Sequence, residues 1–202
     1  MKLYYTPGAC SLSPHIALRE SGLRFELEPV NLQDKKTKSN GDYTAINQKG
    51  YVPALLLDDG QLLTEGAVIV QYVADQKPEA RLAPPAGTFE RLRLQEWLNF
   101  IATELQKSFG PINNAKANDE IKQFYRTRLT SRFQVLAKGL AGRDYLLGDH
   151  FTVADGYAYY TLRNLRKLVG PEFGDSAPLR TYFDRIHRRE AVQAALAAEG
   201  LS

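Results

Sequence analysis

Residues 2–15 read Lys-Leu-Tyr-Tyr-Thr-Pro-Gly-Ala-Cys-Ser-Leu-Ser-Pro-His, and this stretch sets the fold of the N-terminal part of the chain. The apolar and aromatic residues at positions 2–5 favour a short β-strand. Pro7 and Gly8 favour a turn directly after it. Residues 14–21 then follow a helical pattern of apolar side chains. The sequence therefore predicts a strand, a turn and a helix in close succession.

Cys10 is the only cysteine in the chain, and it lies at the start of the predicted helix. Ser11 or Ser13 can cap this helix, and Pro14 suits its first turn. Unpaired backbone N–H groups and the positive end of the helix dipole favour a thiolate over a thiol. The alternative is a small buried hydrophobe, as many cysteines outside disulfides are. Its place between strand and helix favours the reactive thiol.

Composition limits the class of protein. The chain has 202 residues, of which 44% are hydrophobic, which fits one large domain or two small ones. A single cysteine excludes an internal disulfide and fits a reducing compartment. No apolar run is long enough to span a membrane, and the first residues lack the pattern of a signal peptide. We therefore expect a cytoplasmic protein with no membrane partner.

Charge and histidine spacing argue against two further classes of function. The net charge is +3, and the densest basic stretches, 35–38 and 185–189, are short and lack aromatic residues. A solvated surface is therefore favoured over nucleic-acid binding. The three histidines lie far apart in the sequence, at positions 15, 150 and 187, so no metal site is expected. No Gly-rich phosphate loop is present either.

The first part of the chain alternates strand and helix signals. Asp59-Gly60 lies between two apolar runs and predicts a hairpin. The polar stretch 31–47 has room for only a short helix. The predicted strands are 2–5, 25–30, 54–57 and 61–64, and the main predicted helices are 14–21 and 65–75. This order predicts an α/β domain at 1–81 with a mixed four-stranded sheet and helices against it.

The second part of the chain is predicted to be all-helical. Prolines cluster at 78, 84 and 85, near Gly87, and mark a linker. Beyond it, apolar residues recur at spacings of three and four. Thr152 and Asp155 have the spacing of a capping box, which is a structural element. The predicted helices are 89–109, 119–140, 152–169, 178–188 and 191–199, within a helical bundle domain at 87–202.

Several short motifs occur in a specific order along the chain. They are residues 2–15, Gly50-Tyr51-Val52-Pro53, Leu63-Thr64-Glu65-Gly66, Gln71-Tyr72-Val73-Ala74-Asp75 and Trp97-Leu98-Asn99-Phe100. With them, the whole chain resembles a cytosolic glutathione S-transferase. The first segment is similar to the bacterial beta class, in which cysteine replaces the tyrosine or serine used elsewhere. The resemblance implies a thioredoxin-like first domain, a homodimer and a detoxifying enzyme.

The resemblance also implies a glutathione site in the first domain, next to Cys10. Val52-Pro53 would hold a cis peptide and leave the Val52 backbone to pair with the cysteinyl part of the ligand. Glu65 and the backbone of Gly66 would bind the γ-glutamyl end, although the family often has serine in place of this glycine. Lys35 would pair with the glycyl carboxylate. Without the resemblance, Val52-Pro53 suits an ordinary loop that enters a strand, Glu65 suits an acid in the first turn of a helix, and Lys35 suits a solvated surface lysine.

The remaining implied site residues lie in the helical domain. Asn99, Thr103 and Gln106 are spaced by four and three residues, so they predict one polar stripe. By resemblance, this stripe borders the cleft and contributes to glutathione binding. The beta class commonly has histidine where this chain has Gln106, and an amide does not titrate near neutral pH. The implied electrophile pocket is lined by Phe109, Pro111, Tyr157 and Tyr160.

Two chemistries are compatible with this site, with glutathione as co-substrate and no metal. In conjugation, a glutathione thiolate attacks a small hydrophobic electrophile, and the catalytic candidates are Cys10, Ser11 and Tyr5, although Tyr5 equally suits core packing. In disulfide reduction, the absence of a second cysteine at CxxC spacing leaves a monothiol cycle through a mixed disulfide. A third alternative is a non-catalytic binder of hydrophobic ligands, since one fold hosts many functions.

Overall fold

The computed structural model describes residues 1–173 and 176–201, which form two compact units. The first unit comprises Met1–Ala83 and the segment that begins at Arg188, and the second comprises Pro84–His187. The sequence-based domain boundaries, 1–81 and 87–202, differ from this division mainly in the last helix. That helix packs with the first unit although it follows the helical unit in the chain.

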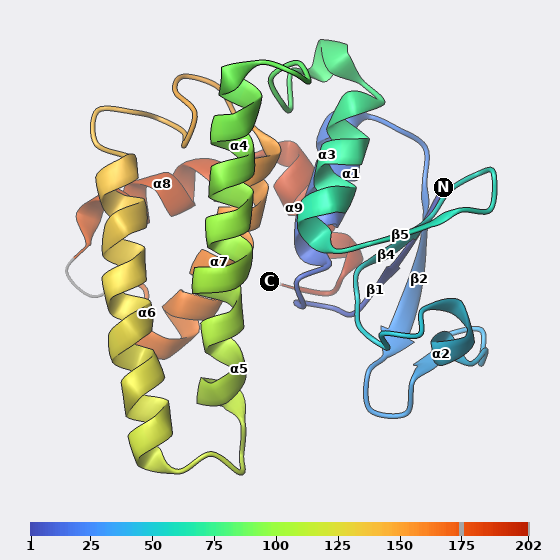
Figure 1. Cartoon of the computed structure of the whole chain (residues 1–202), viewed down its shortest axis with the longest axis horizontal. Helices are drawn as coiled ribbons and strands as arrows, with labels where there is room; N and C mark the ends of the chain where they lie inside the picture. Colours follow the sequence, from blue (N-terminus) through green and yellow to red (C-terminus); the bar gives the residue numbers. More distant parts are fainter. Residues whose placement is uncertain (174–175, 202) are drawn as a thin grey trace. The chain divides into compact units, whose positions relative to one another are not determined.

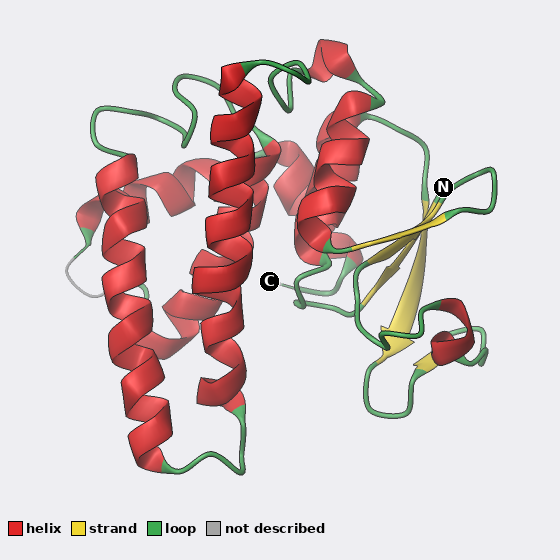
Figure 2. Ribbon diagram, viewed as in Figure 1, coloured by secondary structure: helices red, strands yellow, loops and turns green. Residues whose placement is uncertain are grey.

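The first unit is built on a mixed β-sheet, which Figure 2 shows in yellow. Its strands, β1 (Lys2–Tyr5), β2 (Glu26–Asn31), β3 (Lys36–Thr37), β4 (Ala54–Leu56) and β5 (Leu62–Thr64), lie in the order β3-β2-β1-β4-β5. β1 and β2 are parallel and the other pairs antiparallel. The predicted thioredoxin-like fold is confirmed. The sequence missed β3, because a two-residue strand has no alternation to reveal it.

Helices pack on both faces of this sheet. The longer ones are α1 (Leu12–Ser21), α3 (Gly66–Asp75) and α9 (Glu190–Ala198), and α1 packs against both of the others (Figure 1). The short helix α2 (Tyr43–Ile46) packs through Tyr43 on Tyr4, with ring centroids 5.6 Å apart. The next strand residue, Tyr5, lies near His15 of α1, at 6.1 Å between centroids. Successive residues of β1 thus serve opposite faces, as a strand requires.

The second unit is helical throughout its described elements (Figure 2). They are α4 (Phe89–Phe100), the π-helical segment η2 (Ile101–Gln106), α5 (Lys107–Asn113), α6 (Asp119–Gly139), α7 (Val153–Val169) and α8 (Ala177–His187). The first three form the helix that was predicted to end at Phe109. It continues to Asn113. The helix tolerates Pro111 because this residue lies near the helix end, where few helical hydrogen bonds are lost. Across the described residues, no helix is long and apolar enough to cross a membrane.

The start of α7 is fixed by the buried carboxylate of Asp155. Its Oδ2 accepts from the Thr152 N–H at 2.8 Å and from the Thr152 hydroxyl at 2.9 Å. Its Oδ1 accepts from the Leu146 N–H at 2.9 Å and from the Tyr182 hydroxyl at 2.7 Å. Burial raises the pKa of the Asp155 carboxyl, and the four hydrogen bonds act in the opposite direction. The predicted capping box is therefore confirmed. The same carboxylate also accepts hydrogen bonds from Leu146 and Tyr182, which lie outside the capping box.

Gly139, the last residue of α6, packs directly on Trp97. A Cβ added here would lie 2.6 Å from two ring atoms of the indole. We expect Gly139→Ala to lower the free energy of unfolding by about 1–3 kcal/mol, because the rigid ring must shift. Urea unfolding followed by tryptophan fluorescence measures this, since Trp97 is the only tryptophan in the chain.

Gly110→Ala is the matched control for this prediction. Gly110 is also helical, and nothing lies within 4 Å of a Cβ added there. Because alanine has a higher helix propensity than glycine, we expect the control to be neutral or stabilising by up to about 1 kcal/mol. Equal losses in the two variants would contradict the role assigned to the contact with Trp97.

Candidate active site

Cys10 lies between β1 and α1, and its thiol points toward the loop before β4. The Sγ donates a hydrogen bond to the backbone carbonyl of Val52 at 3.1 Å. The side chain is partly exposed and forms no disulfide. Leu12, two residues later, opens α1. The predicted placement of the thiol at the start of a helix is confirmed.

The expected side-chain cap of α1 by Ser11 or Ser13 is wrong. The Ser11 hydroxyl is fully buried, donates to the Thr6 carbonyl and accepts from the Thr6 N–H, both at 3.2 Å. It closes the turn that carries Cys10 and makes no capping bond to the helix. The Ser13 hydroxyl is buried and has no hydrogen-bond partner within the described part of the chain. Ser11 therefore holds the turn, and its catalytic role stays a prediction.

The turn is also fixed by the C-terminal segment of the same unit. Glu199 accepts a hydrogen bond from the Gly8 N–H at 2.9 Å, and its other oxygen lies 2.8 Å from His15 Nδ1. Arg19 Nε donates to His15 Nε2 at 3.3 Å, so Nδ1 is the ring nitrogen that donates to Glu199. The His15 and Glu199 side chains are both fully buried. The sequence analysis missed this anchor, because nothing local to Glu199 points to a partner near the N-terminus.

The Val52-Pro53 peptide bond is cis, as the resemblance implied. The Val52 carbonyl, which was expected to be available to a ligand, accepts the Cys10 thiol instead. No hydrogen bond of the Val52 N–H occurs among the described residues. Tyr43 and Asn47 hold the preceding carbonyl, that of Tyr51, at 2.9 and 2.8 Å. These contacts therefore hold the backbone of this loop against the thiol in a fixed conformation.

Lys35 lies against the same loop. Its Nζ donates to the Gly50 carbonyl at 3.0 Å and lies 5.5 Å from the centre of the Tyr51 ring. Its backbone has a positive φ of 58°. The structure therefore brings the predicted cation to the loop that carries Val52. Its pairing with a ligand carboxylate stays a prediction.

Glu65 precedes α3 with an unusual backbone, at φ 66° and ψ 114°. Non-glycine residues rarely adopt a positive φ, and such strain concentrates at functional sites. The Glu65 carboxylate accepts from Lys49 Nζ at 2.6 Å, and the same ammonium donates to Thr64 Oγ1 at 3.0 Å. Gly66 is the first residue of the helix, one residue later than the predicted start at 65, so Glu65 lies just before α3 and is not a first-turn acid. Lys49 is a neighbour that the sequence analysis missed.

Tyr5 is buried and belongs to the packed face of β1 next to His15. Burial, followed by the charges of Glu199 and Glu28, raises the pKa of its hydroxyl. A hydroxyl with a raised pKa is a weaker proton donor than an ordinary tyrosine. Of the two interpretations of Tyr5, core packing is the one that these contacts favour.

The predicted polar stripe of the helical unit spans the junction of α4 and η2. Asn99 and Thr103 are exposed, and the Thr103 hydroxyl donates to the Asn99 carbonyl at 2.9 Å. Gln106 is half-buried, and its Oε1 accepts a hydrogen bond from the Tyr157 hydroxyl of α7. The π-helical segment was not predicted, and π-helical turns are often found at functional sites.

The four residues proposed for the electrophile pocket also belong to this unit. Phe109, Tyr157 and Tyr160 are buried, and Pro111 is partly exposed. The Tyr157 and Tyr160 rings lie 6.4 Å apart, whereas the Phe109 ring contacts Phe133 of α6 at 6.5 Å. Their role as pocket residues stays a prediction. No cluster of three or more metal-ligating side chains occurs within residues 1–173 and 176–201.

A thioredoxin-like unit with one thiol beside a cis-proline loop, joined to a helical unit, places the chain among the two-domain thioredoxin-like proteins with a single-cysteine site. Residues 8–76 match the family "Glutathione S-transferase, N-terminal domain", and residues 101–199 match "Glutathione S-transferase, C-terminal domain". The chain therefore belongs to the glutathione S-transferase family.

Individual relatives agree with this assignment. The chain is 44% identical to glutathione S-transferase GstA of Escherichia coli O157:H7, over the full length of both. Its structure is similar to that of BphK, a bacterial glutathione transferase, with 54% identity, a TM-score of 0.96 and full coverage of both chains. It also matches a beta-class enzyme of Sphingomonas chungbukensis, with 42% identity, a TM-score of 0.94 and full coverage of both chains. The predicted resemblance to the bacterial beta class is confirmed.

Proposed function

We propose that this enzyme transfers the thiolate of glutathione to small hydrophobic electrophiles, and that the site around Cys10 binds the glutathione. The observation that carries the proposal is the 3.1 Å hydrogen bond from the Cys10 thiol to the carbonyl of the cis Val52-Pro53 loop. It holds the sulfur against the backbone of Val52, and an extended peptide ligand can align along such a backbone as an added strand.

The three charged parts of γ-Glu-Cys-Gly each have a complementary group near this loop. The Lys35 ammonium suits the glycyl carboxylate. The start of α3 at Gly66 supplies backbone N–H groups for the γ-glutamyl carboxylate, since α3 is a ten-residue helix with its positive end there. Glu65 suits the ammonium group, in place of its present partner Lys49. The Val52 N–H suits the cysteinyl carbonyl of the ligand.

The reaction follows from the position of the sulfur. Glutathione gives up its thiol proton to solvent, and the resulting thiolate attacks a carbon that bears a leaving group such as a halide. A carbon–sulfur bond forms, the carbon–halogen bond breaks, and the halide leaves with the electron pair. Binding contributes by holding the thiolate close to the electrophile and by favouring its ionised form. Phe109, Pro111, Tyr157 and Tyr160 are proposed to accommodate the hydrophobic electrophile.

A monothiol redox reaction is a second activity that the position of Cys10 supports. The Cys10 thiolate attacks the glutathionyl sulfur of a mixed disulfide and releases the other thiol. A second glutathione then attacks the protein–glutathione disulfide, which releases glutathione disulfide and restores Cys10. The third alternative, a non-catalytic binder, is not favoured, because the relatives that match over their full length carry the names of transferases.

We further propose that the enzyme acts as a homodimer in the cytoplasm. Large apolar side chains on the helical unit support association: Phe89 of α4 is 62% exposed, Leu92 of α4 is 53% exposed and Phe124 of α6 is 61% exposed. Such side chains gather at interfaces between subunits. The single cysteine, which excludes an internal disulfide, fits a reducing compartment.

The direct test combines binding and turnover. The purified protein is expected to be retained on immobilised glutathione, to elute with soluble glutathione, and to conjugate glutathione to 1-chloro-2,4-dinitrobenzene. If the protein shows neither retention nor conjugation, the proposal is wrong. Conjugation without retention on the column would support the transfer activity but contradict the glutathione site that we assign around Val52.

Glu65→Gln tests the ammonium-binding role. We expect the KM for glutathione to rise about tenfold with a smaller change in kcat, because the lost contact is made in both the ground state and the transition state. Steady-state conjugation kinetics with varied glutathione measure this split. The substitution should leave thermal stability nearly unchanged, since the carboxylate is 66% exposed.

Glu96→Gln is the matched control. Glu96 is 62% exposed and also pairs with a cation, Arg93, at 2.6 Å, but it belongs to α4 of the helical unit and to none of the proposed glutathione contacts. We expect its KM to equal that of the parent protein. An equal rise in both variants would mean that the effect is one of surface charge and not of the start of α3.

A further inference from the structure

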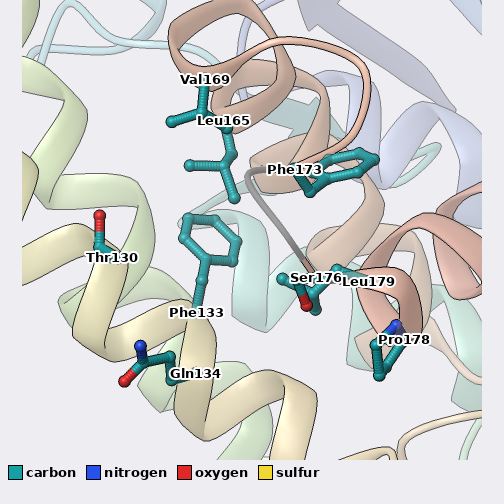
Figure 3. Close-up of a pocket in the computed structure, with 9 residues that line it drawn as sticks. All are labelled: Thr130, Phe133, Gln134, Leu165, Val169, Phe173, Ser176, Pro178 and Leu179. Atoms are coloured by element: carbon teal, nitrogen blue, oxygen red, sulfur yellow. The ribbon is translucent and has the colours of Figure 1, made fainter.

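The carboxylate of Glu65 is occupied by a side chain of the protein itself. Lys49 Nζ donates to Glu65 Oε1 at 2.6 Å and to the Thr64 hydroxyl oxygen at 3.0 Å. Thr64 is the last residue of β5 and Glu65 directly precedes α3, so the ammonium is bound where the strand meets the helix. All three residues belong to the first unit, whereas the side chains in Figure 3, such as Phe133 and Leu165, line a pocket of the second unit. The contact between Lys49 and Glu65 is therefore a feature of the first unit alone.

The Lys49 ammonium has the same chemistry as the ligand group that Glu65 is proposed to bind. Glutathione carries a primary ammonium at its γ-glutamyl end, and both ammonium groups are positively charged hydrogen-bond donors. Two such groups on one carboxylate would lie within a few ångströms of each other and repel. Lys49 and the ligand are therefore expected to compete for Glu65.

The backbone of the loop around Lys49 is held without the Lys49 side chain. The Asn47 side chain accepts from the Lys49 N–H at 3.1 Å and donates to the Tyr51 carbonyl at 2.8 Å. The Gly50 N–H donates to the Asn47 carbonyl at 2.8 Å. The Lys49 side chain is itself 55% exposed, so water can solvate its ammonium after it leaves the carboxylate. Exchange of the two ammonium groups therefore requires no movement of the loop backbone.

We propose that Lys49 is an internal competitor that lowers the affinity of the site for glutathione and weakens its preference for ligands with a free amine, an inference that rests on the proposed function. Glutathione gains an ion pair with Glu65 only after it displaces Lys49, so its net gain is the difference between two ion pairs. A ligand without the amine leaves the contact between Lys49 and Glu65 in place. Because exposed ion pairs are weak, we expect the competition to reduce the affinity for glutathione about two- to fivefold.

The test is calorimetric titration of the full chain with S-methylglutathione, which cannot react, and with its counterpart that lacks the amine, S-methyl-glutaryl-Cys-Gly. Lys49→Met removes the ammonium and keeps most of the apolar side chain. We expect it to lower the dissociation constant of S-methylglutathione about two- to fivefold and to leave that of the amine-free ligand unchanged. Lys49→Ala should give the same result. In the Glu65→Gln background, Lys49→Met should change neither constant, because the shared carboxylate is absent.

Lys77→Met is the matched control, since Lys77 pairs at 2.8 Å with Glu79, a glutamate as exposed as Glu65, and belongs to none of the proposed glutathione contacts. It removes the same charge from the first unit and should leave both dissociation constants unchanged. Weaker or unchanged binding of S-methylglutathione by Lys49→Met would overturn the inference. If Glu65→Gln still lost affinity about tenfold in that case, the proposed glutathione site would stand without the competitor. Affinity that neither Glu65→Gln nor removal of the ligand amine changes would instead contradict the ammonium-binding role of Glu65 itself.

Discussion

Asp155→Ala is expected to lower the free energy of unfolding by about 3–5 kcal/mol, the largest stability loss that we expect from a single substitution in this chain. The carboxylate is fully buried and accepts four hydrogen bonds. Its removal strands the Thr152 and Leu146 N–H groups and two hydroxyl donors in a site that water does not reach. A domain of ordinary stability has only about 5–15 kcal/mol in reserve, so we also expect a low soluble yield.

Urea unfolding followed by circular dichroism measures the loss. Asp119→Ala is the matched control, because Asp119 also lies in the first turn of a helix, α6, but is exposed. It loses only an interaction with the helix dipole, about 0.3–1 kcal/mol. Tyr182→Phe removes a single donor to Asp155 and should cost about 1–2 kcal/mol, which keeps the prediction testable if Asp155→Ala does not fold. Similar losses for Asp155→Ala and Asp119→Ala would contradict the buried network.

Local sequence patterns predicted most of the fold, because strands, helices and caps depend on neighbours in the chain. The spacing of Thr152 and Asp155 predicted the capping box, but the Leu146 and Tyr182 donors come from other elements and carry no pattern. The two-residue strand β3 was too short for a period to show. The π-helical segment 101–106 was missed because its sequence continues the apolar spacing of α4.

The candidate site was likewise predicted only in part from the sequence. Motif order placed Cys10 and the cis Val52-Pro53 bond, and it placed the start of α3 to within one residue, at 65 where the helix begins at Gly66. Each of these features is fixed by a few adjacent residues. The contacts that hold these parts in place were not predictable. Glu199 reaches Gly8 from the far end of the chain, and Lys49 reaches Glu65 across the loop and the hairpin between them. Such contacts depend on the folded backbone and not on sequence spacing.

Cys10→Ala separates the two activities of the proposed site. We expect glutathione-dependent disulfide reduction to fall about a hundredfold or more, because no other cysteine can form the mixed disulfide. Conjugation should fall less than about tenfold, since only one hydrogen-bond donor is lost and the attacking sulfur belongs to glutathione. Parallel assays with a glutathione mixed disulfide and with 1-chloro-2,4-dinitrobenzene measure the two rates.

Two further variants locate the cause of any change. Cys10→Ser keeps a donor toward the Val52 carbonyl but cannot form a disulfide, so it should conjugate like the parent protein and fail to reduce disulfides. Ser13→Ala is the neighbouring control, because its buried hydroxyl makes no hydrogen bond to the described residues and its loss should leave both rates unchanged. If Cys10→Ala reduced disulfides at the rate of the parent protein, this result would contradict the proposed monothiol cycle. A hundredfold loss of conjugation restored by Cys10→Ser would instead assign the thiol a direct part in transfer, through the hydrogen bond that it donates.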